Sequence, residues 1–207
     1  MILNGENMIK TTGILIQEYN SYSNPKMKIG RLVKEGKLIP IIKGLYETDS
    51  SIPGHYLAGI IYGPSYLSFE FALSWHNLIP EAVYTFTSAS YSKKKKKQYD
   101  TYFGQFTYMD IPRQVFPYGT KVYEENGYGF VIASKEKAIC DQLYKCAPCS
   151  SKKELKSLLF EDLRIDEDLF WDMDIITMTE LASSYRNKNH SLLISLIKER
   201  QRNAGTA

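Results

Sequence analysis

Cysteine and histidine side chains are the first candidates for chemistry in this sequence, because both can ligate a metal ion. Cys146-x-x-Cys149, preceded by Cys140, has a spacing that occurs in zinc sites. A structural zinc site needs four ligands, and no second C-x-x-C or H-x-x-x-H follows. The three histidines share no ligand spacing: His55, His76 and His190. We therefore expect reduced thiols, no metal site and no cofactor, with His76 in a structural role at a helix end.

Acidic pairs and phosphate-binding loops would indicate an enzyme. Asp172-x-Asp174 has the spacing of the metal-binding pair of a nucleotidyltransferase, but no Gly-Ser strand-turn motif precedes it, so a solvated helix end explains it better. The chain contains neither G-x-x-x-x-G-K-[S/T] nor G-x-S-x-G. We expect a protein that is not an enzyme. A nuclease or transferase is an alternative only if acidic residues distant in sequence converge in space.

Clusters of lysine and arginine have a clear chemical use, because these side chains bind phosphates. The 207-residue chain has a formal charge of only +3, but this charge is unevenly distributed. Residues 23–46 carry six basic side chains and one acidic one, whereas residues 161–174 carry seven acidic side chains and one basic one. A run of five lysines forms a second basic segment: Lys93, Lys94, Lys95, Lys96 and Lys97.

The lysine run has two interpretations. It lies between two predicted strands, so the simpler one is a flexible, solvated surface loop. The other is a second phosphate-binding patch that extends a DNA footprint or contacts RNA. Five adjacent charges would then make the affinity strongly dependent on salt.

The first basic segment begins with a predicted amphipathic helix. Pro25 suits its first position and Asn24 its cap, while Gly36 suits its C-terminal end. At about 100° per residue, one face carries apolar side chains and the opposite face carries basic ones. The apolar set is Ile29, Leu32 and Val33, and the basic set is Lys28, Arg31 and Lys34. A short, imperfect helix around Gly13 is expected before it, over residues 8–17.

A short β-hairpin is predicted directly after this helix. Residues 38–42 are β-prone, Lys43-Gly44 makes a tight turn, and Pro40 indicates an edge strand. A basic helix followed by a hairpin is the arrangement of a winged helix-turn-helix, with the helix in the major groove and the hairpin along the DNA backbone. The alternative is an ordinary solvated helix beside a hairpin. The predicted DNA-binding residues are Lys26, Lys28, Arg31, Lys34, Lys37 and Lys43.

The remaining sequence predicts one sheet followed by helices. Ser134 is expected to cap a helix in which Lys137 and Asp141, four residues apart, lie on the exposed side. A hairpin is expected around Asn126-Gly127 in residues 121–132. Strands are also predicted at residues 83–87 and 99–111. Helices are predicted at residues 53–61, 66–75 with Ser65 or Ser68 as cap, 152–160, 166–171, from Thr177 or Thr179, and 191–202.

Three segments, in this order, carry a family resemblance. GRLVKEGKLIPIIKGLYE (residues 30–47) resembles the winged-helix segment of the AbiEi-family antitoxins. PSYLSFEFALSWHNLIPEAVYTFTSAS (residues 64–90) and FVIASKEKAICDQLY (residues 130–144) are similar to two later segments of that family. The resemblance implies an α+β protein with a minimal winged helix-turn-helix at residues 1–50. It also implies a mixed domain, a small sheet flanked by helices, at residues 51–207. The middle helix of the helix-turn-helix is expected to be very short or absent.

The resemblance also implies a function. AbiEi-type proteins are antitoxins of bacterial type IV toxin-antitoxin systems linked to abortive phage infection, and they repress their own operon. We expect a cytoplasmic transcriptional regulator that binds double-stranded operator DNA and opposes a nucleotidyltransferase-like toxin, without necessarily binding it. No signal peptide or membrane span is apparent. The alternative is a protein-interaction module in which the winged helix is not used for DNA and the C-terminal domain binds a toxin or another partner through acidic residues 161–174.

Overall fold

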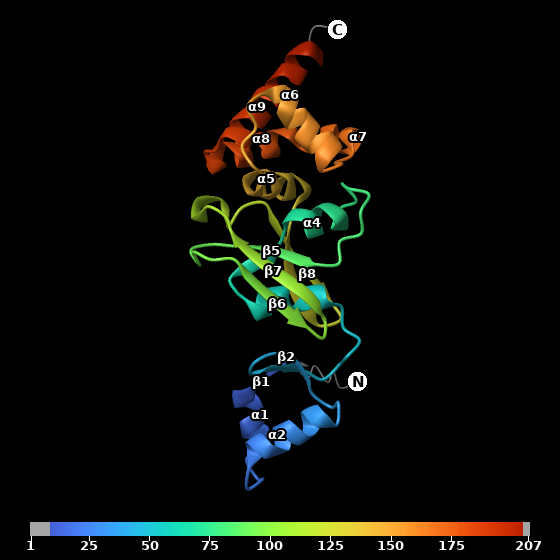
Figure 1. The fold of residues 1–207 in the computed structure, drawn as a ribbon, viewed down its shortest axis with the longest axis vertical. Helices are drawn as coiled ribbons and strands as arrows, with labels where there is room; N and C mark the ends of the chain where they lie inside the picture. Colours follow the sequence, from blue (N-terminus) through green and yellow to red (C-terminus); the bar gives the residue numbers. More distant parts are fainter. Residues whose placement is uncertain (1–8, 205–207) are drawn as a thin grey trace.

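The computed structural model describes residues 9–204, which fold as an α+β protein, as predicted. Figure 1 shows three parts along the long axis of the molecule. A small N-terminal unit (blue) lies at one end, a mixed sheet (green) in the middle, and the later helices (orange and red) at the other end. Within residues 9–204, no helix combines the length and the apolarity that crossing a bilayer would require.

The described part of the N-terminal unit contains two helices and a three-stranded sheet. Asn24 caps α2, since its Oδ1 accepts a hydrogen bond from Met27 N at 3.1 Å, and Gly36 leaves the helix with φ of 71°. The predicted cap, helix end and hairpin are confirmed, and Pro40 lies in an edge strand because the strand order is β1-β3-β2. The elements are β1 (Lys10–Thr11), α1 (Thr12–Glu18), α2 (Pro25–Lys34), β2 (Ile39–Ile42) and β3 (Leu45–Glu47).

The first helix differs from the prediction over residues 8–17. Met8 lies outside the described residues, and Lys10 and Thr11 pair with β3 as a short strand. Thr11 then caps α1, because its hydroxyl accepts a hydrogen bond from Ile14 N at 3.2 Å. In the described part of the chain, α1 and α2 are therefore the two helices that precede the hairpin.

A single six-stranded sheet forms the middle of the molecule, which confirms the prediction of one sheet. The strand order is β6-β7-β5-β4-β9-β8, with β5/β7 and β4/β9 parallel and the other neighbours antiparallel. The hairpin at Asn126-Gly127 is confirmed, and both turn residues have positive φ. The strands are β4 (Ser65–Leu67), β5 (Phe86–Ser90), β6 (Lys97–Thr101), β7 (Gly104–Asp110), β8 (Thr120–Glu125) and β9 (Tyr128–Ala133).

Helices cover the sheet and make up the C-terminal end. Ser134 caps α5 as predicted, whereas α8 begins at Ile175 because Asp174 caps it. The helices outside the N-terminal unit are η1 (Gly54–Leu57), α3 (Ala58–Ile61), α4 (Phe69–Trp75), η2 (Arg113–Val115), α5 (Lys135–Lys145), α6 (Lys152–Ser157), the π-helical turn η3 (Leu158–Asp162), α7 (Glu167–Trp171), α8 (Ile175–Tyr185) and α9 (Lys188–Ala204).

Three predicted segments around the sheet differ from the structure, and the last helix begins at Lys188 instead of residue 191. The helix expected at residues 66–75 begins only at Phe69, because residues 65–67 pair with β5 and β9 as strand β4. The strand expected at residues 83–87 is β5, displaced to Phe86–Ser90. Residues 99–111 were expected to form one strand, but the chain reverses after Thr101, so β6 and β7 form a hairpin. In each case the pairing between strands, rather than the composition of the segment itself, decides the boundary.

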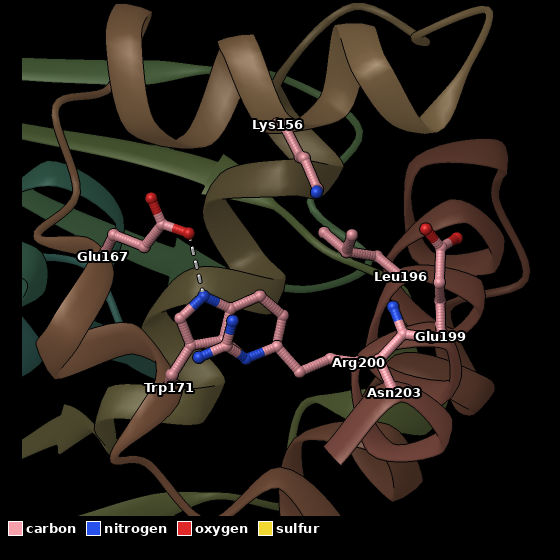
Figure 2. A pocket seen from close by; sticks show the side chains of 7 residues that line it. All are labelled: Lys156, Glu167, Trp171, Leu196, Glu199, Arg200 and Asn203. Carbon is pink, nitrogen blue, oxygen red and sulfur yellow. Dashed lines mark hydrogen bonds between the residues drawn. The ribbon is translucent and has the colours of Figure 1, made fainter. Parts of the chain in front are cut away.

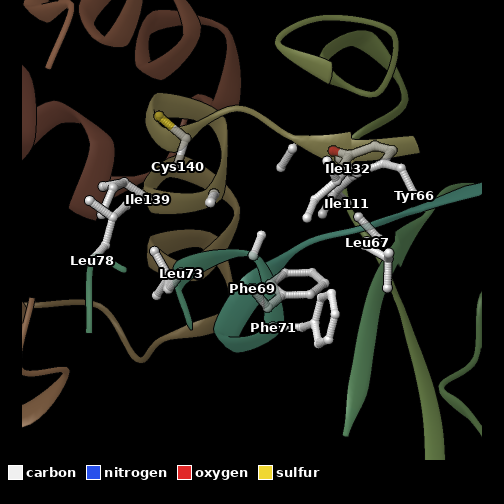
Figure 3. Packing of buried hydrophobic residues seen from close by; sticks show 14 of the residues in the cluster. Tyr66, Leu67, Phe69, Phe71, Leu73, Leu78, Ile111, Ile132, Ile139 and Cys140 are labelled. Carbon is white, nitrogen blue, oxygen red and sulfur yellow. The ribbon is translucent and has the colours of Figure 1, made fainter. Parts of the chain in front are cut away.

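The protein has a large core and a separate small one. Figure 3 shows part of the large core, where Leu73, Leu78 and Ile139 pack between α4 and α5, and Phe69 and Ile132 join this layer to the sheet. The small core lies inside the N-terminal unit and consists of Leu15, Ile29, Leu32 and Leu38. The predicted apolar face of α2 is therefore buried as expected, with Val33 half-buried at its edge.

Lys137 and Asp141 do not lie on the exposed side of α5, as the sequence suggested; both side chains have 0% exposure. Lys137 Nζ lies 3.2 Å from Asp141 Oδ1 and donates hydrogen bonds to Val115 O and to the Tyr185 hydroxyl. Asp141 accepts hydrogen bonds from Tyr66, Ser68 and Tyr185. The prediction is wrong because both faces of α5 are covered: α4 and the sheet pack on one and α8 and α9 on the other.

Breaking this pair should destabilise the protein strongly. Lys137→Met or Asp141→Leu alone should each lower the free energy of unfolding by about 3–5 kcal/mol, because each leaves one buried charge without its partner. The double variant should cost less than the sum of the two, since it removes both charges together. Urea unfolding of the four proteins measures this coupling, and strictly additive costs would show that the two charges do not depend on each other.

Candidate nucleic-acid interface

A groove runs between α2 and the β2–β3 hairpin, on the exposed side of the N-terminal unit. Its floor is mainly apolar, and three lysines lie around it, two from α2 and one from the hairpin turn. Among the described residues no acidic side chain lines this groove. The floor consists of Ile29, Val33, Pro40, Ile42 and Tyr46, and the lysines are Lys26, Lys34 and Lys43. We call these three the rim lysines.

The six predicted DNA-binding residues do not form one continuous row. Lys28 is half-buried, and its ammonium lies 5.1 Å from the centre of the Tyr22 ring, so it faces away from the groove. Lys37 is exposed but lies 2.9 Å from the Glu35 carboxylate. Arg31 is exposed and does not line the groove. The structure thus brings together Lys26, Lys34 and Lys43, and separates Lys28, Arg31 and Lys37 from them.

The Glu35–Lys37 pair reduces the positive field beside the groove. A hydrogen bond from Lys37, together with its charge, lowers the pKa of the Glu35 carboxyl below its usual value. Glu35 is therefore ionised at neutral pH and offsets the charge of Lys37. The rim lysines have no such carboxylate partner among the ion pairs between described residues.

Gly30 also lines the groove, and sequence reasoning missed it. It is exposed and lies inside α2, where glycine is about 1 kcal/mol less favourable than alanine. A Cβ added at Gly30 would have no heavy atom within 4 Å. The signal that could have found it is a glycine inside an amphipathic helix, with a lysine four residues away on each side.

The lysine run forms a surface loop up to Lys96, as the simpler interpretation expected, and hydrogen bonds attach the start of this loop to the sheet. The Asp110 carboxylate accepts hydrogen bonds from the backbone N–H groups of Lys93 and Lys94, both at 2.7 Å. Lys93 Nζ donates to Gly63 O at 2.9 Å, and Lys97 belongs to strand β6. Lys94, Lys95 and Lys96 are exposed, and Lys96 and Lys97 line a second hollow together with Lys145.

A further pocket lies between α6, α7 and α9 (Figure 2). The Trp171 indole N–H donates to Glu167 at 3.1 Å, and the Arg200 guanidinium lies 4.9 Å from the centre of the indole ring. Lys156 and Glu199 complete the charged lining, so two cations and two carboxylates balance one another. This pocket therefore has no excess charge that would attract a nucleic acid.

The histidines and cysteines occupy structural positions. His76 lies at the C-terminal cap of α4, as expected, with Nε2 2.8 Å from Ala133 O. The three cysteines are free thiols, and burial raises the pKa of each, which disfavours the reactive thiolate. Asp174 is exposed and accepts hydrogen bonds from the first turn of α8. Across residues 9–204, no three histidine, cysteine or acidic side chains converge as metal ligands would.

Comparisons with known proteins bear on the fold alone. No protein-family profile and no curated protein sequence matches the chain. A solved structure, the crystal structure of the RV2827C protein from Mycobacterium tuberculosis, is similar with a TM-score of 0.56 and 13% sequence identity. The match covers 91% of this chain and 71% of that one. The α+β architecture is therefore shared with a known structure at a low level of sequence identity.

The rim lysines should be dispensable for folding. The triple variant Lys26→Ala, Lys34→Ala, Lys43→Ala should change the free energy of unfolding by no more than about 0.5 kcal/mol for each substitution, because the side chains are exposed. By contrast, Leu32→Ala should cost about 2–5 kcal/mol, because it empties the small core. Chemical unfolding followed by circular dichroism compares the two, and a triple variant as unstable as Leu32→Ala would mean that the lysines hold the fold.

Proposed function

We propose that this protein binds double-stranded DNA through α2 and the β2–β3 hairpin, in the manner of a winged helix-turn-helix. The observation that carries the proposal is the groove with its three rim lysines and no acidic side chain among the described residues that line it. The outer side of α2 enters the major groove, where Arg31 and the exposed Met27 face the bases. The hairpin turn at Lys43 lies along the phosphate backbone.

The resemblance to AbiEi-family segments extends this proposal to a biological role. The protein acts as an antitoxin-type transcriptional regulator that represses its own operon and opposes a nucleotidyltransferase-like toxin, without an enzymatic activity of its own. DNA binding belongs to the N-terminal unit, proposed as residues 1–50, and the antitoxin role to residues 51–207. The N-terminal unit has a small core of its own, which supports the assignment of the two roles to different parts of the chain.

A DNA titration over a series of salt concentrations tests the proposal. Wild-type protein should bind a duplex from upstream of its own gene more tightly than an unrelated duplex of equal length, and its affinity should fall steeply as salt rises. The triple rim-lysine variant should bind more weakly. Its slope of log affinity against log salt should be less steep by about 0.9 for each phosphate that the variant no longer neutralises.

The control variant removes the same charge elsewhere. Lys121, Lys135 and Lys153 are exposed on β8, α5 and α6, and their replacement by alanine should leave the salt slope unchanged. A third variant, with Lys94, Lys95 and Lys96 replaced by alanine, measures whether the lysine run extends the footprint. Equal reductions in affinity for the rim-lysine and control variants would refute a specific interface on the N-terminal unit.

Protein binding is the second candidate function, and one observation favours it. All seven acidic side chains of residues 161–174 are exposed, which gives the C-terminal end a surface suited to a basic partner. Under this alternative, the wild-type protein should prefer neither duplex at any salt concentration. Binding to the product of an adjacent toxin gene, weakened by replacing Glu167 and Asp168 with their amides, would then be expected.

A further inference from the structure

Gly30 lies at the centre of the proposed interface. It lines the groove between Lys26 and Lys34, each one helical turn away, and faces the hairpin that carries Lys43. The two lysines of α2 are about 12 Å apart along the helix axis, because eight residues at 1.5 Å each separate them. The backbone of α2 is therefore exposed at the midpoint between two cations.

The usual structural reasons for a glycine do not apply at Gly30. Gly36 and Gly44 have positive φ, but Gly30 belongs to the regular part of α2. At Gly54 an added Cβ would lie 2.4 Å from Phe103 O, so close packing requires that glycine. At Gly30 it would meet no atom within 4 Å. Glycine at this position thus lowers the stability of α2, and no contact in the described structure requires it.

We propose that Gly30 leaves room for one sugar-phosphate strand of duplex DNA, which lies in the groove between α2 and the hairpin and passes Gly30 between Lys26 and Lys34. This inference rests on the proposed function and assigns the part of the duplex that occupies the groove. The strand carries an anionic charge at every nucleotide, so it meets all three rim lysines whatever its register. Its deoxyribose rings offer apolar surface to Ile29, Val33 and Ile42 on the floor.

The assignment predicts that stability and binding respond to Gly30 in opposite directions. Gly30→Ala should raise the urea midpoint, because alanine is the better helix former and its methyl group would have open space in the free protein. The same methyl group would occupy space that the strand needs. Gly30→Leu fills more of the groove and should weaken DNA binding by about tenfold or more, with Gly30→Ala between it and wild type.

Binding of the upstream duplex to wild type, Gly30→Ala, Gly30→Leu and Gly59→Ala is measured by fluorescence anisotropy, with urea unfolding of each protein. Gly59 is the matched control: it is exposed, lies in helix α3, and an added Cβ would meet only Ser65 O, at 3.9 Å. Gly59→Ala should bind DNA like wild type. Gly30→Ala keeps the test valid if the leucine variant does not fold.

The outcomes separate the inference from the proposed function. If wild type shows no salt-sensitive preference for its own upstream DNA, the proposed function fails and this inference fails with it. If wild type binds and the rim-lysine variant loses affinity, but both Gly30 variants bind like wild type, the inference alone is overturned. The groove would then bind a different ligand, such as an acidic protein segment. A Gly30→Ala variant that is less stable than wild type would also overturn it, because the glycine would then have a structural reason.

Discussion

The buried ion pair between Lys137 and Asp141 of α5 is the point at which hydrogen bonds from the sheet, η2 and α8 meet. Burial lowers the pKa of Lys137, whereas the Asp141 charge opposes this effect. Burial also raises the pKa values of Tyr66 and Tyr185 well above their usual value, so both hydroxyls stay protonated and donate to Asp141. Two charges out of water are tolerated only when their remaining hydrogen bonds are satisfied, and here strand β4, η2, α5 and α8 each contribute a partner. The pair therefore connects α8 to α5 and to strand β4 of the sheet through buried hydrogen bonds.

The N-terminal unit is joined to this scaffold at the end of strand β3. Glu47 is fully buried, and its carboxylate accepts hydrogen bonds from the Tyr128 hydroxyl at 3.0 Å and from Asp49 N at 3.1 Å. Ile41 of the hairpin also belongs to the large core. The hairpin thus contacts the scaffold on one side and lines the groove with α2 on the other. These contacts position the hairpin, and binding surfaces are more precise when such contacts support them.

Local chemistry could be predicted from the sequence, whereas distant pairing could not. The Asn24 cap, the Lys43-Gly44 turn and the Asn126-Gly127 hairpin depend on neighbouring residues, and all three are present. Lys137 and Asp141 looked like an exposed helical pair, because spacing of four residues is typical of solvent-facing ion pairs and gives no sign of what covers the helix. Tyr66 and Leu67 were expected to begin a helix but lie in strand β4, because their pairing partners in β5 and β9 are distant in sequence and local composition does not reveal them.

The sequence predicted basic residues on α2 and the hairpin, but only three of the six predicted side chains line the groove. The helical period placed Lys28, Arg31 and Lys34 together, but Tyr22 attracts Lys28 to the other flank, and the hairpin gathers Lys26 and Lys43 beside Lys34. Charge counts along the sequence could not show which lysines line the groove, because the groove forms only when the hairpin packs beside α2. The same fold gives Gly30 its position, which a search for charged residues overlooks.

Whether DNA occupies the face formed by α2 and the hairpin is best decided by a two-dimensional NMR titration of the ¹⁵N-labelled protein with its own upstream duplex. If it does, the largest amide shift changes fall in α2 and at Lys43-Gly44, with small changes in the C-terminal helices. Changes confined to residues 93–97 or 161–174, with α2 unaffected, would contradict the proposed interface.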